Sequence, residues 1–176
     1  MSASPYSPVR RVVTGHTPEG ESSVLKDMQQ PPRFWYPGAT SPIYDLHWTS
    51  EAPARLDTEL TSPNREWVDE SLGHPEVVSL NGSVFRALDM APGDSSPWHR
   101  TESCDYVIVM KGIITLELQH GEPTALKTGD VIVQRATMHR WVNKSAVEWA
   151  TIYYVAVPAI PVEVGGKKLE AYFPPQ

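Results

Sequence analysis

Two histidines, His99 and His139, stand in short apolar segments, the first of them close to Thr101 and Asp105. Residues two apart in a strand share a face, so His99 and Thr101 are expected to point the same way. Asp105 begins the next segment, and His139 is expected on a facing strand. Histidine titrates near neutral pH, so two imidazoles and a carboxylate in a half-buried pocket can act as general acid and base. We take His99, Asp105 and His139 as candidate catalytic residues.

Thr101 and Trp141 are candidate pocket residues beside the two histidines. Strand parity places Trp141 on the same inward face as His139, where its indole could form a wall for a flat ligand. Plain core packing is the alternative role for this tryptophan.

Two arginines are candidate contacts for an acidic substrate. Arg86 lies within the apolar segment 83–88, and a buried arginine there needs an anionic partner. That partner is either a substrate carboxylate or phenolate, or a protein acid such as Asp105 or Asp89. Arg135 follows another apolar segment, on a loop at the expected mouth of the pocket, where it could orient an acidic substrate.

The remaining pattern predicts an all-β fold. Prolines and glycines separate short runs rich in Val, Ile, Tyr and Trp, as is typical of many brief strands. Eight or more strands suit a closed barrel or jelly roll. The expected strands are 9–14, 23–28, 42–49, 83–90, 105–111, 113–119, 130–134, 139–142 and 147–157.

The segments outside the central strands are assigned by composition. Residues 1–8 are expected to be flexible, and 9–78 to form N-terminal strands and a surface excursion packed on a barrel of residues 79–157. Within the proline-rich stretch 50–78, only 64–72 has a weak helical pattern. Residues 158–176 contain four prolines and predict an extended arm, which Tyr172 and Phe173 could anchor.

Bulk composition excludes several classes of function. The net charge is -6 and no run of Lys and Arg exceeds two residues, so the basic surface of a nucleic-acid binder is missing. The single cysteine, Cys104, cannot form an internal disulfide, and apolar runs fall far short of the roughly 20 residues of a membrane span. We expect a cytoplasmic protein with a small-molecule partner. Strands in excess of a minimal barrel suggest a homodimer.

Two blocks of the sequence resemble the motifs of the cupin family. Residues 93–112, around His99, are similar to the first motif, in which a glycine is followed by two histidines, a carboxylate and a second glycine. Residues 129–143, around His139, are similar to the second motif. The resemblance implies a cupin double-stranded β-helix, here with an N-terminal strand extension and a C-terminal arm.

Typical cupins hold a divalent metal with three histidines and a glutamate, and this chain departs from that set. Thr101 replaces the second histidine and is a poor metal ligand, and Asp105 is one methylene shorter than the usual glutamate. The remaining His99, Asp105 and His139 have the composition of the two-histidine, one-carboxylate set of non-haem iron oxygenases. Either these three bind a divalent metal (Fe, Mn, Ni or Zn), or the pocket binds no metal.

More narrowly, the chain resembles small single-domain cupin oxidoreductases of microbes and of fungal polyketide biosynthetic clusters. This resemblance implies a tailoring enzyme, by preference an oxidoreductase acting on an aromatic or polyketide-like compound in secondary metabolism. Two alternatives stay open. One is a metal-independent lyase or isomerase that uses His99 and His139, and the other is a ligand-binding cupin without turnover. The segments that carry the resemblance are 10–16, 83–86, 99–106 and 134–141.

Overall fold

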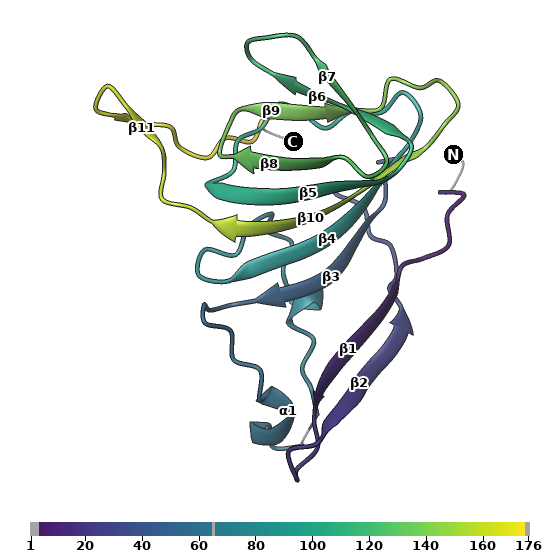
Figure 1. Ribbon diagram of the computed structural model, residues 1–176, viewed down its shortest axis with the longest axis vertical. Coiled ribbons are helices and arrows are strands. Elements are labelled where there is room, and N and C mark those ends of the chain that lie inside the picture. The colour runs from purple at the N-terminus through teal and green to yellow at the C-terminus, as the bar shows by residue number, and fades with distance from the viewer. Residues whose placement is uncertain (1–3, 65, 175–176) are drawn as a thin grey trace.

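Two antiparallel sheets face each other and form the barrel of this computed structural model, which describes residues 4–64 and 66–174 (Figure 1). The larger sheet has the order β3–β4–β10–β5–β8 and the smaller one β7–β6–β9. The all-β, double-stranded β-helix prediction is confirmed. The barrel strands are β3 (Ile43–Thr49), β4 (Ser83–Met90), β5 (Ser103–Lys111), β6 (Ile113–Leu118), β7 (Thr124–Lys127), β8 (Val131–Arg135), β9 (His139–Val142) and β10 (Ala150–Pro158).

Strand β5 shows how the sequence separates the inside of the barrel from the outside. Val107 and Val109 are buried and join Ile152 of β10 in the core between the sheets. Tyr106 and Ile108 alternate with them and stay 54% and 43% exposed. Because successive side chains of a strand point to opposite faces, the odd-numbered residues of β5 form the inner wall. Asp105 therefore points inward.

The tight turn between β5 and β6 depends on Gly112. Its φ is 70°, a conformation that L side chains rarely adopt. A Cβ at this position would also lie 2.5 Å from the carbonyl oxygen of Trp149. The turn that the sequence predicts at residues 111–112 thus requires glycine for two independent reasons, and it fixes how β5 passes into the opposite sheet.

The N-terminal strands β1 (Arg10–His16) and β2 (Ser22–Gln29) stand at one side of the barrel (Figure 1). Among the strands of the described residues, they pair with each other alone. Within residues 4–8, two side chains contact the barrel. Ser4 donates a hydrogen bond to Asp89 (2.8 Å), and the Tyr6 hydroxyl donates one to the carbonyl of Trp149 (3.2 Å). Residues 1–3 lie outside the described part of the chain.

The excursion between β3 and β4 contains one short helix, α1 (Thr58–Thr61), and a 3₁₀ turn at Glu70–Gly73. The helix expected over 64–72 is wrong for 66–69, which have no regular structure, and Arg65 lies outside the described residues. The physical reason is Asp69. Its carboxylate pairs with the buried guanidinium of Arg11 and accepts a hydrogen bond from the backbone N–H of Ser71 (3.2 Å).

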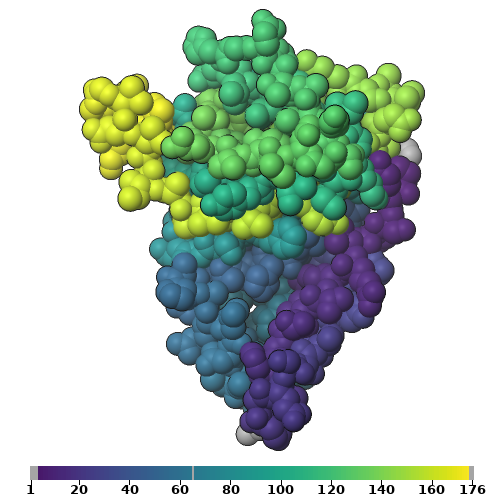
Figure 2. Space-filling view, viewed as in Figure 1, coloured from purple at the N-terminus to yellow at the C-terminus, as the bar shows by residue number. Residues whose placement is uncertain are grey.

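The C-terminal arm begins with a small hairpin of β11 (Glu163–Val164) and β12 (Lys167–Lys168). This hairpin protrudes from the molecule (Figure 2), and the sequence pattern missed it together with β7. The arm then returns to the barrel, where Tyr172 and Arg100 exchange two backbone hydrogen bonds of 2.9 Å. Within the described ranges, no helix is both long and apolar enough to cross a membrane.

Candidate active site

The two histidines that the sequence singled out lie directly opposite each other. The backbone N–H of His99 donates to the carbonyl of His139 (3.0 Å), and the N–H of His139 donates back to the carbonyl of His99 (3.0 Å). This reciprocal pair fixes the separation of the two backbones. The ring centroids are 4.3 Å apart, so the backbone itself brings the imidazoles into contact.

The hydrogen bonds of each ring determine which nitrogen is free. The Nδ1 of His99 lies 2.9 Å from the carbonyl oxygen of Pro97. A carbonyl only accepts, so Nδ1 carries the proton and the Nε2 of neutral His99 carries the lone pair. His99 is therefore arranged as a base at Nε2.

The Nδ1 atom of His139 has a hydrogen-bond partner in either neutral tautomer of the imidazole. Its Nδ1 lies 2.9 Å from the carbonyl oxygen of Thr137 and 2.9 Å from the side-chain nitrogen of Gln134. Thr137 holds the Gln134 amide in this orientation by donating its backbone N–H (3.1 Å) and its hydroxyl (2.6 Å) to Oε1. Protonated Nδ1 can donate to Thr137, and unprotonated Nδ1 can accept from Gln134. The Nε2 of His139 can thus be an acceptor or a donor.

Burial keeps both imidazoles neutral. It lowers the pKa of His139 to about 4, with a further lowering by the neighbouring His99. Burial also lowers the pKa of His99, although its hydrogen bond to Pro97 opposes the shift. Asp105 moves the other way, because burial raises the pKa of its carboxyl to about 6 against the hydrogen bond from Ser103. Perturbed pKa values of this kind are typical of functional sites.

These shifts predict opposite pH dependences for two variants. Between pH 4 and 6.5 unfolded His139 binds a proton that the folded state excludes, so this group makes stability rise with pH. Asp105 keeps its proton in the folded state up to about pH 6 and loses it near 3.8 when unfolded, so its contribution falls with pH. As the pH rises from 4 to 6, the free energy of unfolding of His139→Leu should fall relative to that of wild type. Over the same range, the free energy of unfolding of Asp105→Asn should rise relative to that of wild type. Each change is on the order of 2 kcal/mol. Urea unfolding at three pH values measures both, and slopes of the same sign would contradict the assignment.

Asp105 is bonded to the hydroxyl of Ser103 on the inner wall, and Ser103 in turn contacts Thr101. The Ser103 hydroxyl lies 2.6 Å from Oδ1 of Asp105 and 2.8 Å from the hydroxyl oxygen of Thr101. Thr101, Ser103 and Asp105 are all buried. Because Ser103 has a single proton to donate, the three groups form a short chain of hydrogen bonds.

The candidate metal ligands do not come together as a ligand set. Across residues 4–64 and 66–174, no three His, Cys, Asp or Glu side chains are grouped closely enough to hold a metal ion. His99 and His139 meet on one side of the barrel, but Asp105 belongs to the opposite sheet and is bound to Ser103. The shorter aspartate and Thr101 thus leave a pair of imidazoles rather than a chelating triad, and the arrangement does not fit the expected three-ligand metal site.

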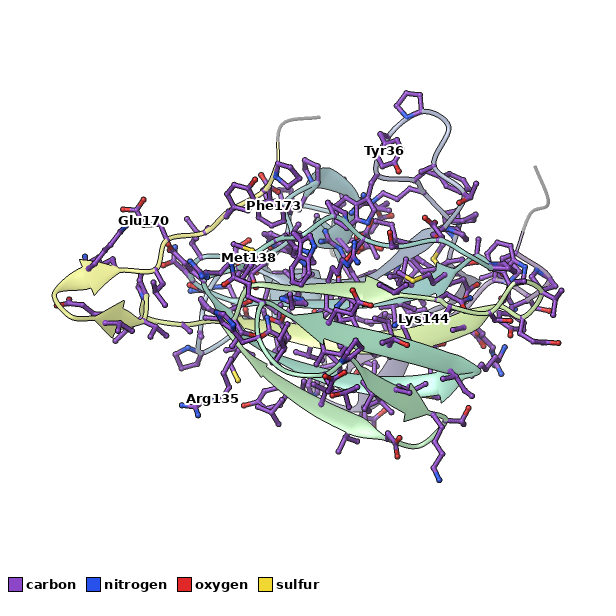
Figure 3. The ribbon with its side chains drawn as sticks, turned by 90° about the horizontal axis from the view of Figure 1, so that it is seen from above. Tyr36, Arg135, Met138, Lys144, Glu170 and Phe173 are labelled. Carbon is purple, nitrogen blue, oxygen red and sulfur yellow. The ribbon has the colours of Figure 1, made fainter. Side chains whose placement is uncertain are left out.

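One cavity of about 1490 Å³ joins most of the predicted site residues. Its wall includes His99, Thr101, Asp105, His139 and Trp141. Aromatic rings from the N-terminal and C-terminal segments complete it, and Figure 3 shows Tyr36 and Phe173 on the same side of the barrel. The further aromatic lining residues are Phe34, Trp35, Trp98 and Tyr154. A large apolar pocket with a few polar groups is typical of a small-molecule site.

The two predicted substrate arginines are placed elsewhere. Arg86 is 1% exposed, and its guanidinium pairs with Asp45 rather than with Asp105 or Asp89. It also donates to the carbonyls of Glu76 (2.7 Å) and His74 (2.9 Å), and it does not line the cavity.

Arg135 is exposed on the outside of the barrel, away from Tyr36 and Phe173 (Figure 3). Residue 134 of β8 faces inward, so strand parity turns residue 135 outward. Arg135 is therefore not at the mouth of the cavity.

Phe173 of the C-terminal arm stacks against the ring of His99. Its ring lies 5.6 Å from that of His99, with the two planes 22° apart. Because such an aromatic contact contributes about 0.5–1.5 kcal/mol, Phe173→Ala should weaken binding of a flat probe such as 2-naphthol by about three- to tenfold. Quenching of tryptophan fluorescence measures this affinity. Tyr172→Ala, which removes an exposed neighbouring ring that does not line the cavity, should leave it unchanged, and equal effects would contradict the contact.

The loop before β3 also belongs to the site, and the two motif blocks gave no indication of it. Residues 33–36 lie outside those blocks, but the run Phe34-Trp35-Tyr36 between polar segments was a visible signal. Gln134, the partner of His139, was not predicted either. It is a buried polar residue on a strand of the second block, and such residues require hydrogen-bond partners.

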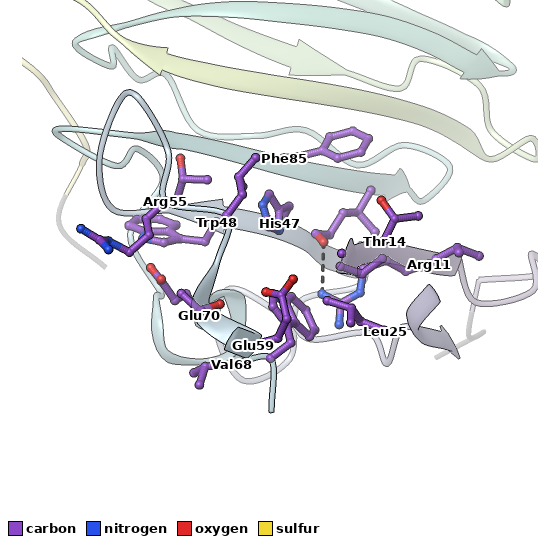
Figure 4. A pocket seen from close by; sticks show the side chains of 18 of the residues that line it. Arg11, Thr14, Leu25, His47, Trp48, Arg55, Glu59, Val68, Glu70 and Phe85 are labelled. Carbon is purple, nitrogen blue, oxygen red and sulfur yellow. Dashed lines mark hydrogen bonds between the residues drawn. The ribbon is translucent and has the colours of Figure 1, made fainter. Parts of the chain in front are cut away.

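A second cavity, of about 900 Å³, lies between the N-terminal hairpin and β3 (Figure 4). Figure 2 shows the surface hollowed between these N-terminal segments and the 50–60 region. None of the predicted site residues lines this cavity. Its polar wall includes Arg11 and Glu59, whose Oε1 accepts from the backbone N–H of His16 (2.9 Å).

Comparison with known proteins identifies the family. Residues 87–153 match the cupin domain. Oryzines biosynthesis cluster protein J of Aspergillus oryzae is 31% identical over 93% of this chain and 90% of that protein. The cupin-domain-containing oxidoreductase fogC of Aspergillus ruber is 32% identical over 94% of this chain and 80% of that protein. Among solved structures, the polyketide cyclase RemF of Streptomyces resistomycificus aligns with a TM-score of 0.48 and 17% identity, over 81% of this chain and 78% of that chain. By its two motifs, its barrel and its relatives, the chain belongs to the cupin family.

Proposed function

We propose that this cupin is a tailoring enzyme of secondary metabolism that moves a proton on a small aromatic, polyketide-like substrate. The observation that carries the proposal is the pair of neutral imidazoles, 4.3 Å apart, in the wall of an aromatic cavity. Its relatives are named for biosynthetic clusters and as oxidoreductases, which supports the setting. The chemistry below rests on the residues of this chain.

The geometry suits abstraction of a proton from a carbon next to a carbonyl. The Nε2 of His99 takes the proton, and the Nε2 of His139, in the form whose Nδ1 accepts from Gln134, donates a hydrogen bond to the oxygen on which negative charge develops. The imidazolium of His99 then returns the proton to a different atom of the substrate. No electrons are lost or gained, so the net result is an isomerisation or, with a leaving group, a dehydration.

Deuterium incorporation into a simple ketone tests this function and does not require the natural substrate. The protein is incubated in D₂O with 2-tetralone, a neutral bicyclic ketone with an acidic carbon next to its carbonyl. We expect faster uptake of deuterium than in buffer, unchanged by EDTA and followed by mass spectrometry. Exchange at the buffer rate at all protein concentrations would contradict the proposal.

The names of several relatives favour a second candidate, an oxidoreductase. Such a reaction needs an electron acceptor or a divalent metal (Fe, Mn, Ni or Zn), and the described side chains form no three-ligand set for one. Elemental analysis of the purified protein after reconstitution separates the candidates. About one metal per chain together with activity lost on chelation would favour the oxidoreductase, whereas a far lower metal content would contradict it.

A further inference from the structure

Beside the histidine pair, the cavity has a second polar feature, in which two guanidinium groups share one carboxylate. Asp45 on β3 is 7% exposed and pairs with both Arg33 and Arg86. Each guanidinium group is positive and the carboxylate is negative. The three side chains therefore carry one more positive than negative charge, and this charge lies at the wall of an apolar cavity.

The excess charge resides on Arg33. Arg86 is fully engaged, since its three nitrogens donate to Asp45 and to the carbonyls of Glu76 and His74. Arg33 donates from Nε and Nη2 to the two oxygens of Asp45, and within the described residues its Nη1 donates to no protein group. Its side chain is 31% exposed and lines the cavity.

Two further contacts hold the guanidinium of Arg33 in place. Its backbone exchanges two hydrogen bonds of 2.9 Å with Ile43 at the start of β3. Its guanidinium carbon lies 4.7 Å from the ring centroid of Trp35. The Asp45 contact fixes one edge of the planar group and the indole its face, so the Nη1 edge is the part left for a ligand.

The other acids that line the cavity are Glu76, Asp94 and Asp105, and among the described residues none of them forms an ion pair with Arg33. Glu76 also lines the cavity, but its side chain is 59% exposed and its Oε2 lies 3.3 Å from the Nδ1 of His74. Solvent screens such an exposed charge strongly. A carboxylate or phenolate of a ligand at Arg33 would instead be shielded by the aromatic wall, where a charge-assisted hydrogen bond is strongest.

We propose that Arg33 is an anion-binding residue of this cavity and that its natural ligand is an aromatic compound with a carboxylate or an ionised phenol. This proposal adds a substrate class to the proposed function. It rests on that function in one respect, because both assume that this cavity binds the substrate. Arg33 takes the role that the sequence pattern predicted for Arg86 and Arg135. The polar end at Arg33 would orient the ligand, while the histidine pair acts on another part of it.

A matched pair of probes tests the proposal. Binding of 2-naphthoate and of neutral 2-naphthamide is measured by titration calorimetry for wild type, Arg33→Gln and Arg10→Gln. Wild type should bind naphthoate at least tenfold more tightly than naphthamide. Arg33→Gln should remove this preference and leave naphthamide binding unchanged, because Arg86 still pairs with Asp45. Arg10 forms an equivalent pair with Asp27 on the exposed hairpin, so Arg10→Gln should keep the preference.

The outcomes separate this proposal from the proposed function. Equal affinities in wild type, a preference that survives in Arg33→Gln, or binding of neither probe at millimolar concentration would each overturn the role of Arg33. Deuterium exchange of 2-tetralone, which has no anionic group, should proceed equally in wild type and in Arg10→Gln, whose substitution lies outside the cavity. Loss of exchange in both proteins with an intact naphthoate preference would reject proton transfer and retain the anion site.

Discussion

Replacing Arg86 with methionine is expected to lower the free energy of unfolding by about 3 kcal/mol. The guanidinium is 1% exposed and donates to Asp45 and to two backbone carbonyls. Methionine fills a similar volume but leaves those acceptors with fewer donors, which is costly in a buried setting. The loss should lie at the lower end of the range for broken buried pairs, because Arg33 still pairs with Asp45. Urea unfolding at pH 7 measures it.

The hairpin offers a matched control for this stability prediction. Arg10 pairs with Asp27, but the two side chains are 65% and 45% exposed. Solvent screens such an exposed pair, so Arg10→Met should leave the free energy of unfolding nearly unchanged. Equal effects of the two substitutions would show that the Arg86 network is not a buried ion pair.

Replacing His139 with leucine is expected to slow deuterium exchange of 2-tetralone at least about 100-fold. The substitution removes both the second imidazole and the hydrogen bond that it can offer to the developing oxyanion, while the backbone bridge to His99 stays intact. Binding of 2-naphthamide should change by less than threefold, as checked by calorimetry, which separates a loss of chemistry from a loss of the cavity.

A second leucine variant controls for the general effect of losing a histidine. The side chain of His16 on β1 is 51% exposed and lies outside the cavity. His16→Leu should therefore exchange at the wild-type rate. If His139→Leu also exchanges at that rate, the histidine pair does not carry the proton transfer.

The sequence predicted those parts of the site that depend on strand parity and turn chemistry. The alternation along β5 and β9 turned Asp105, His139 and Trp141 inward, because side chains of a strand alternate between faces. The same rule places Arg135 outside, and the misassignment came from taking its segment as a loop. The turn at Gly112 was likewise readable, since a positive φ there favours glycine.

The remaining features depend on contacts between segments far apart in the sequence. Arg86 was correctly expected to need an anion, but its partner Asp45 lies 41 positions away and became its neighbour only through the pairing of β3 with β4. Whether Asp105 could reach the histidines depended on the distance between two sheets, which no local pattern encodes. The expected helix over 64–72 was wrong at 66–69 for a similar reason, because Asp69 is held by Arg11 of the hairpin.

The segment that carries His99 and Arg100 is bonded on two sides. His99 exchanges its amide hydrogen bonds with His139 of β9, whereas Arg100 exchanges them with Tyr172 of the arm. Backbone amides exchange their hydrogens with solvent only when such bonds open. The amides of His99 and His139 should therefore exchange together when the imidazole pair separates, and those of Arg100 and Tyr172 when the arm lifts. The hydrogen-exchange rates of these four amides would therefore report two separate motions of one site.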